Sequence, residues 1–511
     1  MISKPARRRW AIAAGIIIGM VVLIAVVAAI SASALNRSLR SRMESALASH
    51  FQGDITFQQF DATVFPHFHL NAAGMVVRRK DDSDLPPLVE AMRLEGDGPS
   101  LLLLMGHIRQ LKIEGLSLNI PVGRARSAPA SRQAEHFPVV IDRITSDGAH
   151  LEILRTKSEK PPLQFDIRHL EMTSVNLDQP SPFHATLLNP EPRGEIETNG
   201  KFGPWNGEEP SATPVSGSYT FSHADLATFN GLGGILSSTG KYTGVLRQID
   251  VQGEADVPGF ELTMAHHPLP LHTSFHATVD GTNGNTTLQS VSGNLKSTPI
   301  SASGEITKVQ DAQGRRILLD GSVTGGRLED VLQLVVRSTP PPLSGSVSLH
   351  TQIDLPPGNE DVIKRLRLAG DFAIHSARFS SINIREKLES LSRRAKGMPE
   401  ETSAGSSITN MKGSFTLDSG AATFSNLMFG VDGASLQLAG RYELPNERMD
   451  FHGKLLMDAE LSQTTTGLKA FFLKALNPLF RKKDGNGSEI PISISGTRSS
   501  PSFGLDIGKK F

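Results

Sequence analysis

The chain contains no cysteine among its 511 residues. This absence excludes disulfide bonds, thiolate metal sites and cysteine nucleophiles. The chain also lacks a net charge, because 52 lysine and arginine residues balance 52 aspartate and glutamate residues. The chain therefore has no overall basic field that would favour nucleic acid, and no acidic field that would favour a cationic partner. We predict that nucleic acid is not a partner.

The sequence motifs of common enzyme classes are missing as well. The chain has no Walker loop, no G-x-S-x-G elbow and no H-E-x-x-H zinc motif. Residues 231–234 (GLGG) form only part of a dinucleotide fingerprint and are predicted to be a flexible turn. We therefore predict that the protein is not an enzyme, and that it has no catalytic residues and no cofactor.

Candidate metal ligands occur in two places, and neither set is complete. His67 and His69 would share one face of a strand, but no third ligand is indicated beside them. The acidic residues of 81–84 (DDSD) lie among turn formers and are predicted to form a solvated loop rather than a calcium site. The sequence therefore predicts no metal.

Turn-forming residues are abundant, whereas core-forming residues are not. The chain has 47 glycines and 31 prolines, and its apolar content is 38%. This composition predicts many short strands rather than a large helical core. Residues 412–444 show the pattern most clearly, because Phe415 and Leu417 point to one side of a strand while Ser414 and Thr416 point to the other.

Two turns and one irregularity divide residues 412–444 into strands. Residues 419–420 (Ser-Gly) and 432–433 (Asp-Gly) are sequences typical of hairpin turns. Phe424 and Phe429 do not fit one period of two, so a register slip is expected between them. The stretch is predicted to be an antiparallel meander with one apolar face and one polar face.

The same alternation recurs along most of the chain. Strands that begin with glycine are predicted at Gly217, Gly253, Gly304, Gly321, Gly345, Gly370 and Gly413. Their loose spacing predicts successive hairpins in one extended sheet rather than the equal blades of a propeller. The run Leu101–Met105 is interpreted as another strand, buried in protein because it is too short to span a membrane.

Four segments have the pattern of helices instead. We predict short helices at 224–229 and 327–336, and longer helices at 384–396 and 468–480. The last of these is rich in phenylalanine and leucine, which favours a role as a plug at the end of the sheet. A lid or a membrane-touching element is the alternative, because the basic residues of 481–483 (RKK) follow it.

The N-terminus carries an uncharged apolar run at 10–30. About 20 such residues are needed to cross a hydrocarbon core of ~30 Å. The basic tail of 1–9 places the N-terminus in the cytoplasm by the positive-inside rule, so the rest of the chain is exported. A cleaved signal peptide is the alternative, since residues 31–34 (SASA) suit a signal peptidase, but the run exceeds the usual apolar length of ~7–15 residues.

Several features follow one another along the chain: the N-terminal anchor, the turn at 65–66 (Phe-Pro), the leucine-rich and alternating stretch 101–118, and the C-terminal sequences 413–420 (GSFTLDSG), 440–442 (GRY), 477–479 (NPL) and 491–497 (PISISGT). In this order they resemble the AsmA-like family of bacterial envelope proteins. The middle of the chain, about residues 178–376, is similar only in style.

This resemblance implies a mainly β fold. An N-terminal transmembrane helix would be followed by an elongated, curled antiparallel sheet whose groove holds lipid acyl chains, with a few short helices. The implied regions are a cytoplasmic tail (1–9), an anchor (10–30), an N-terminal helix and β-region (35–121), a linker or long loop (122–136), a middle β-groove region (137–400) and a C-terminal module (401–511).

The resemblance also implies a location and a function. The protein would be a single-pass inner-membrane protein with its bulk in the periplasm. It would support phospholipid transport and outer-membrane assembly and integrity, with the membrane, a phospholipid or other lipid, and other envelope proteins as partners. The candidate lining residues of the groove are Phe415, Leu417, Phe424, Leu436, Leu438, Phe451, Leu455, Ile492 and Ile494.

The alternating strands are compatible with a lipid-binding groove but do not require one. Exposing a chain of ~16 carbons to water costs on the order of 10 kcal/mol, at about 0.8 kcal/mol for each CH₂. Alternating strands supply an apolar lining, and about 25 strands spaced ~4.8 Å apart would reach roughly 120 Å. The same alternation also suits a closed sandwich core. Two further functions therefore stay open: a structural or assembly factor of the envelope with a closed β core, and an envelope enzyme with an unrecognised site.

Overall fold

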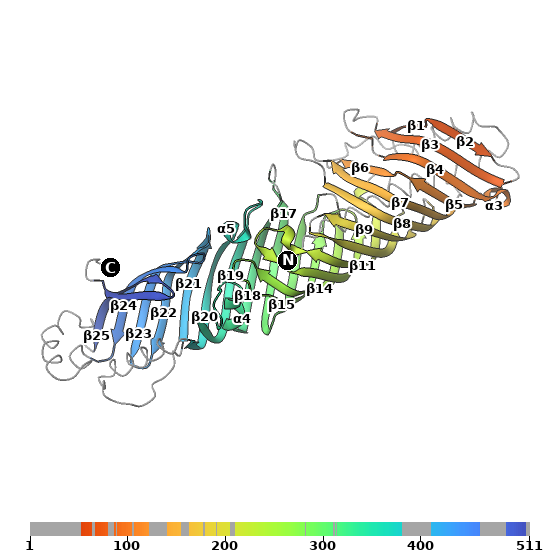
Figure 1. Cartoon of the computed structure of the whole chain (residues 1–511). Helices are drawn as coiled ribbons and strands as arrows, with labels where there is room; N and C mark the ends of the chain where they lie inside the picture. Colours follow the sequence, from red (N-terminus) through yellow and green to blue (C-terminus); the bar gives the residue numbers. More distant parts are fainter. Residues whose placement is uncertain are drawn as a thin grey trace.

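The computed structural model contains one long β-sheet, which Figure 1 shows from its first strands to its last. The structure describes residues 53–63, 67–79, 86–87, 89–104, 107–121, 140–154, 163–176, 179–190, 192–204, 210–281, 283–309, 312, 314–380, 410–459 and 487–506. Several predicted features lie outside these residues: the anchor at 10–30, the turn at 65–66, the acidic loop at 81–84, the linker at 122–136, and the helices at 384–396 and 468–480.

Within these described ranges the sheet has 26 strands. The N-terminal segment of the sheet comprises β1 (Gly53–Thr56), β2 (Gln59–Thr63), β3 (His67–Arg79), β4 (Val89–Pro99), β5 (His107–Glu114), β6 (Ser117–Pro121), β7 (Val140–Leu154), β8 (Leu163–Val175), β9 (Ser181–Pro190), β10 (Arg193–Phe202), β11 (Pro214–Asp225), β12 (Leu232–Gly233), β13 (Ile235–Val245) and β14 (Gln248–Leu262).

The C-terminal segment of the sheet comprises the remaining strands: β15 (Leu269–Val279), β16 (Thr286–Leu295), β17 (Thr298–Lys308), β18 (Arg315–Arg327), β19 (Leu343–Leu355), β20 (Arg367–Phe379), β21 (Asn410–Asp418), β22 (Ala421–Val431), β23 (Ala434–Glu443), β24 (Arg448–Met457), β25 (Ser488–Thr497) and β26 (Ser500–Leu505).

Strand order in the sheet follows the order of the chain. From β7 to β26 each strand pairs antiparallel with the next, apart from the two-residue β12, which pairs with β14 while β11 pairs with β13. One junction departs from this pattern, because β5 and β6 both lie antiparallel to β4 and parallel to β7. The prediction of one extended antiparallel sheet is therefore confirmed except at this junction.

The hairpin between β21 and β22 shows why this sequence forms a meander. Ser419 and Gly420 have φ angles of 51° and 73° between the paired residues Asp418 and Ala421. Two left-handed residues make a turn whose twist matches that of the flanking strands. Further along β22 the register with β23 shifts between Phe424 and Leu427, which confirms the predicted slip.

The helices within the described residues are short, and one of them corrects a prediction. The strand expected at 101–105 is wrong, because Ser100–Leu104 form the helix α3, and Leu101 is 68% exposed rather than buried. A short apolar run does not distinguish strand from helix, and leucine is a strong helix former. The helix α4 (Leu328–Gln333) and the 3₁₀ helix η2 (Leu226–Thr228) lie inside the ranges predicted for helices.

Two further short helices were not predicted. They are the 3₁₀ helix η1 (Pro210–Ala212) and the helix α5 (Val362–Arg365), which lies in the connection between β19 and β20. Asp361 caps α5, since its Oδ1 accepts a hydrogen bond of 2.9 Å from the amide of Ile363. Within the described ranges, no helix combines the length and the apolar character that a membrane crossing requires.

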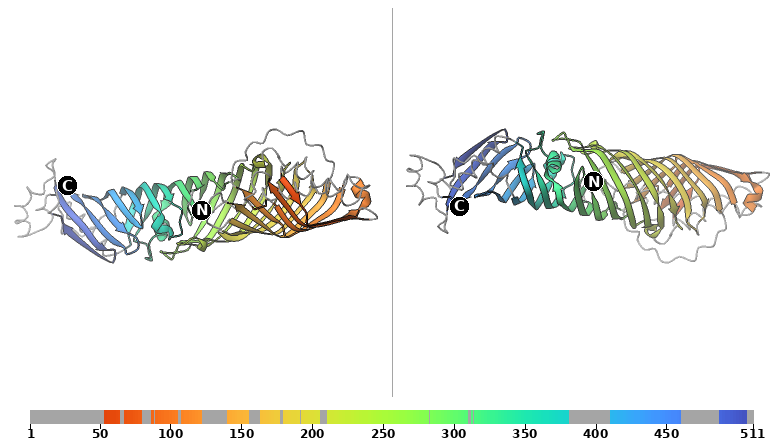
Figure 2. Two further views of the ribbon diagram at one scale, coloured as in Figure 1. Left: turned by 90° about the horizontal axis from the view of Figure 1, so that it is seen from above. Right: turned by 90° about the horizontal axis from the view of Figure 1, so that it is seen from below.

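The molecule is elongated and twisted, as the views from above and below make clear (Figure 2). At the N-terminal end, strands β1 to β4 lie across those that follow them (Figures 1 and 2). One hydrophobic cluster joins buried residues of these first strands to buried residues of β7 through β14, for example Leu70, Ile144 and Phe221. The right-handed twist of the strands brings about this curling, and it covers one face of the N-terminal segment with its own chain.

Candidate functional site: the apolar face

All nine predicted lining residues lie on one face of the sheet. Residues that are directly paired across antiparallel strands share a face, as do residues two apart on one strand. Phe415 pairs with Phe424, which pairs with Gly440, and Gly440 pairs with Phe451, which pairs with Ile494. The same register places Leu417, Leu436, Leu438, Leu455 and Ile492 on this face.

These nine side chains differ in exposure. Leu417, Leu436 and Leu438 are buried, with 5–6% of their surface exposed, whereas the other six residues are only half-buried. Rings from four strands meet around Phe424, whose centroid lies 5.9 Å from that of Phe451 and 6.1 Å from that of Phe372. This is a cluster of rings that remains partly open to solvent. Tyr442 shares the face, and burial raises the pKa of its phenol to about 12.

The register continues this apolar face through the whole sheet. Phe415 pairs with Gly370, and successive pairings lead back through Phe275, Tyr219 and Leu170. In the N-terminal segment this face is packed shut, because residues such as Leu111 and Ile144 have no exposed surface. One continuous face therefore has a closed part and a half-open part.

A lane of small residues runs along the half-open part. It consists of Ala302, Gly321, Thr351 and Gly370, which pair in succession across β17 to β20. Larger apolar side chains lie on either side of the lane and form two separate clusters. One contains Leu319 with Ile306 and Leu288, and the other contains Val323, Val347 and Ile374 with partly buried neighbours. Glycine and alanine project little or nothing beyond the backbone, so the lane is low at Ala302, Gly321 and Gly370, whereas Thr351 places a buried side chain in it.

Glycines elsewhere on this face make room for aromatic rings. A Cβ atom built on Gly240 would lie 2.7 Å from the ring of Tyr219, and one built on Gly440 would lie 2.7 Å from the ring of Phe451. The rings thus lie flat over the glycines of the neighbouring strands. The same reason accounts for three of the glycines at the start of predicted strands, because rings also lie close to Gly217, Gly253 and Gly413.

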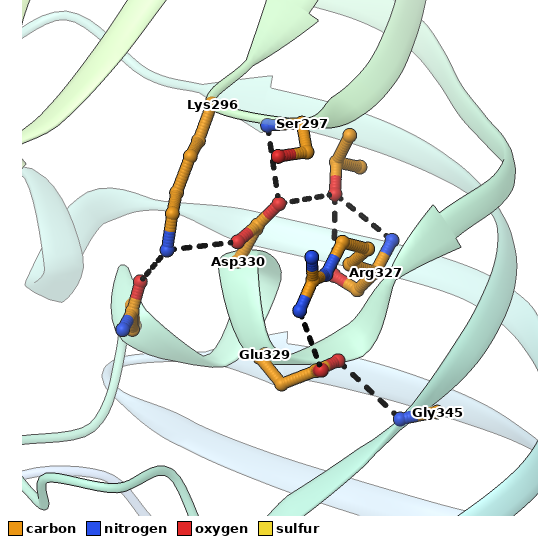
Figure 3. A network of polar contacts seen from close by, with 8 residues as sticks. Lys296, Ser297, Arg327, Glu329, Asp330 and Gly345 are labelled. Carbon is orange, nitrogen blue, oxygen red and sulfur yellow. Dashed lines mark hydrogen bonds and ion pairs between the residues drawn. The ribbon is translucent and has the colours of Figure 1, made fainter.

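The helix α4 is fastened over one end of the half-open part by a buried carboxylate (Figure 3). Asp330 is 1% exposed, and its Oδ2 accepts hydrogen bonds from the Ser297 amide at 3.2 Å and from Thr298 Oγ1 at 3.1 Å. Its Oδ1 makes no hydrogen bond, but it lies 3.2 Å from Lys296 Nζ and forms an ion pair. These contacts tie α4 to the turn between β16 and β17.

A second carboxylate ties α4 to β19. Glu329 accepts a hydrogen bond from the amide of Gly345 at 3.3 Å and one from Arg327 Nη2 at 3.3 Å (Figure 3). Leu328, Val331 and Leu332 of the helix consequently pack against the apolar cluster of β18 to β24. Sequence reasoning predicted this helix but not the network that holds it, because its partners come from separate turns.

The opposite face of the sheet is polar, and it carries histidines beside aspartates. These pairs are His107 with Asp142, His150 with Asp166, His169 with Asp147, His272 with Asp256, His276 with Asp250, His350 with Asp320, and His452 with Asp450 and Asp506. Each forms a local cross-strand or neighbouring contact. In the portion of the chain that the structure describes, no group of three or more such residues is placed to hold a metal ion.

An apolar face of this kind is chemically suited to non-covalent contact with apolar molecules. No protein-family model, no curated protein and no solved structure matches this chain.

Proposed function

We propose that this protein is anchored in a membrane and binds lipid acyl chains along its apolar face, and that it thereby supports phospholipid transport and outer-membrane integrity. In this proposal residues 10–30 form the anchor in the inner membrane, and the sheet lies in the periplasm. The protein makes and breaks no bond. The observation that carries the proposal is the continuous apolar face, whose C-terminal part stays half-open around Phe415, Phe424 and Phe451.

The exposure of this face favours a ligand that covers it. A contiguous apolar surface in water is unfavourable, and such surfaces mark interaction sites. An acyl chain is a suitable cover, because on the order of 10 kcal/mol is gained when ~16 carbons leave water. The headgroup would stay at the rim, where polar side chains begin.

The lane of small residues gives a linear ligand a place to lie. Alkyl chains are narrow and flexible, and the lane is flanked along its length by aliphatic side chains of β17 to β20. A path of this kind runs across the strands and therefore along the long axis of the molecule (Figure 1).

A second function is favoured by a different observation. The N-terminal segment has a packed core in which residues from Ile55 to Val257 have almost no exposed surface. This core suits a structural or assembly factor that docks other envelope proteins and passes no lipid. The two functions differ in what the C-terminal segment contacts in the cell.

Site-specific photo-crosslinking in the full-length chain separates these functions. A photoreactive phenylalanine analogue at Phe415 faces the half-open apolar surface, whereas the same analogue at Thr416 faces the opposite, exposed side of the same strand. We expect phospholipid adducts, identified by mass spectrometry, at position 415 and not at 416. Adducts with protein alone at position 415 would support the assembly factor and contradict lipid binding.

Filling the lane gives an independent test. Gly321 has an ordinary backbone conformation, and a Cβ atom there would meet nothing closer than Ile353 Cδ1 at 3.4 Å. Gly321→Leu should lower the yield of lipid adducts at position 415, and resistance to proteolysis would verify that the variant is folded. Ser322→Leu adds the same side chain to the other face and should leave the yield unchanged. Equal yields from both variants would remove the lane from the proposed path.

A further inference from the structure

Two connections from different parts of the sheet meet in a contact that we call the bridge. It joins residues 230–231, between β11 and β13, to residues 359–362, between β19 and β20. The carbonyl of Asn230 accepts a hydrogen bond of 2.8 Å from the amide of Val362. The side-chain Nδ2 of Asn230 donates one of 2.6 Å to the carbonyl of Asn359.

The two connections belong to opposite long edges of the sheet. In an antiparallel meander successive connections alternate between the edges, and the β19–β20 connection comes seven connections after the β11–β13 connection. Seven is odd, so the two lie at different edges. Figure 1 shows the same alternation, with α4 at the lower edge and α5 of the following connection at the upper edge.

The bridge passes over the apolar face rather than behind the sheet. Leu226, in the connection after β11, is 1% exposed within the main hydrophobic cluster, and Phe229 and Leu232 pack against that cluster. On the other side Val362 and Ile363 are buried, with 6% and 7% of their surface exposed. Both arms of the bridge therefore carry buried apolar side chains.

The bridge stands where the closed part of the apolar face gives way to the half-open part. The main cluster contains residues up to Val257 and Val279, while the lane lies on β17 to β20. The strands that lie between the two arms of the bridge, β13 to β19, therefore include three of the four strands that carry the lane. A chain lying along the lane from the C-terminal side runs towards the bridge.

Hydrogen bonds between the two edges help to hold the bridge closed. Two of them join Asn230 to Val362 and to Asn359, and single hydrogen bonds stabilise proteins only weakly because water replaces them. Asn230 and Asn359 are both exposed. Gly231 supports the close approach, because a Cβ atom there would lie 2.6 Å from Asp361 Oδ1, and its φ of 98° suits glycine.

We propose that the bridge is a clasp over the lipid path, which holds an alkyl chain in the lane while closed and releases it sideways when open. This inference rests on the proposed function, since it names the element that regulates the same site. The clasp determines how long a lipid stays, and the half-open face around Phe424 determines where it enters.

Removing one hydrogen bond should speed lipid release. Val362 is the first residue of α5, where proline is well tolerated, and Asp361 before it has the extended ψ of 134° that proline requires. Val362→Pro therefore deletes the amide that donates to Asn230 without breaking the helix. Val362→Ala keeps that amide and is the matched control.

Release would be measured with the full-length protein in vesicles of phosphatidylethanolamine and phosphatidylglycerol that contain a pyrene-labelled acyl chain. We expect lipid to leave Val362→Pro several-fold to about tenfold faster than the wild type. Val362→Ala should release lipid at the wild-type rate. Far-UV circular dichroism would verify that each variant is folded.

Locking the clasp provides the opposite change. A Cβ atom on Gly231 would lie 3.0 Å from Cγ of Asp361, which is where the sulfur of a cysteine at 361 would lie. The pair Gly231→Cys and Asp361→Cys has only one possible intramolecular disulfide, because the natural chain has no cysteine, and non-reducing electrophoresis would detect any disulfide between two chains. The reduced form of the same variant is its control, and it accounts for strain at residue 231.

Oxidation should slow exchange of the labelled lipid at least tenfold, and reduction should restore it. If Val362→Pro and the oxidised pair both exchange lipid at the rates of their controls, the clasp is wrong and lipid binding stands. If the wild type takes up no labelled lipid at all, the proposed function fails and the clasp fails with it. The two failures are therefore distinguishable.

Discussion

The two segments of the sheet present the same kind of face in two states. In the N-terminal segment Phe68 and Leu70 are 1% exposed and Leu111 is fully buried. In the C-terminal segment Phe424 and Phe451 occupy equivalent positions on the same face, yet they remain half-buried. Both segments are built from alternating strands, so alternation alone does not decide whether an apolar face is covered.

The two segments differ in the strands and helices that cover their apolar faces. Strands β1 to β4 lie across the N-terminal face and complete one cluster with β7 to β14 (Figure 2). Over the C-terminal face the described residues supply only α4 and the arms of the bridge, and the apolar side chains there fall into two smaller clusters. A curled sheet thus yields a closed core at one end and a half-open apolar face at the other.

The largest expected effect comes from placing a charge on each part of the face. Ile144→Asp puts a carboxylate into a fully packed site and should prevent folding, because an unpaired buried charge costs several kcal/mol or more. Phe451→Asp places the same group where solvent reaches it, and the protein should stay folded but lose lipid adducts at position 415. Resistance to proteolysis reports folding in both variants.

Ile144→Val is the control for the first change and should cost only about 1 kcal/mol. Unfolding of both aspartate variants would mean that the C-terminal face is a closed core as well. Stable folding of both would mean that the N-terminal core is less tightly packed than its exposed areas indicate.

Large-to-small substitutions should reproduce the contrast on a smaller scale. Phe68→Ala removes a ring that is 1% exposed and should cost about 3–5 kcal/mol. Phe424→Ala removes a half-buried ring and should cost only about 1–2 kcal/mol, because part of that ring is already in contact with water. Urea titrations followed by circular dichroism would measure both, and equal losses would contradict the difference between the segments.

The sequence predicts local features of the fold well. A period of two puts Phe415, Leu436 and Ile494 on one face whatever the tertiary structure is, because strand geometry alone determines it. The register slip after Phe424 and the helix within 327–336 likewise depend on residues close together in the chain. The strand expected at 101–105 failed, because a short leucine run is ambiguous and its flanking turns decide its form.

Closure of the face was beyond prediction for a physical reason. Phe68 and Phe451 are each followed by a histidine in a strand, yet Phe68 is 1% exposed and Phe451 is half-buried, because what covers each ring depends on how the sheet curls over many strands. The bridge depends on Asn230 and Asn359, which are 129 residues apart and carry no distinguishing pattern. The lane was missed as well, since glycines in strands signal close approach or turns without saying which.

The pKa of Tyr442 reports how far water is excluded from the half-open face. Burial raises the pKa of its phenol to about 12, with a smaller contribution from Glu447. Because the folded pKa exceeds the usual value of 10.0, the related stability is present below pH 10 and is lost as the pH rises towards 12. Difference absorbance of tyrosinate between the wild type and Tyr442→Phe would measure this, and titration near pH 10 would show a wetter face.

The smallest effects should be equal in the two segments, because the polar face is alike throughout. Lys112 Nζ donates a hydrogen bond of 2.6 Å to Glu114, and the Arg316 guanidinium donates two, of 2.9 and 3.0 Å, to Asp354. These bonds hold the pKa of each carboxyl below its usual value of 4.5 or 3.8. A lowered pKa adds stability at pH values above the usual pKa, and that stability is lost as the pH falls through the folded pKa.

Glu114→Gln and Asp354→Asn should each lower the urea midpoint slightly at pH 7, since both pairs are largely solvent-screened. Both differences should vanish in acid below the two folded pKa values. A loss confined to one variant would show that the segments differ on their polar face too.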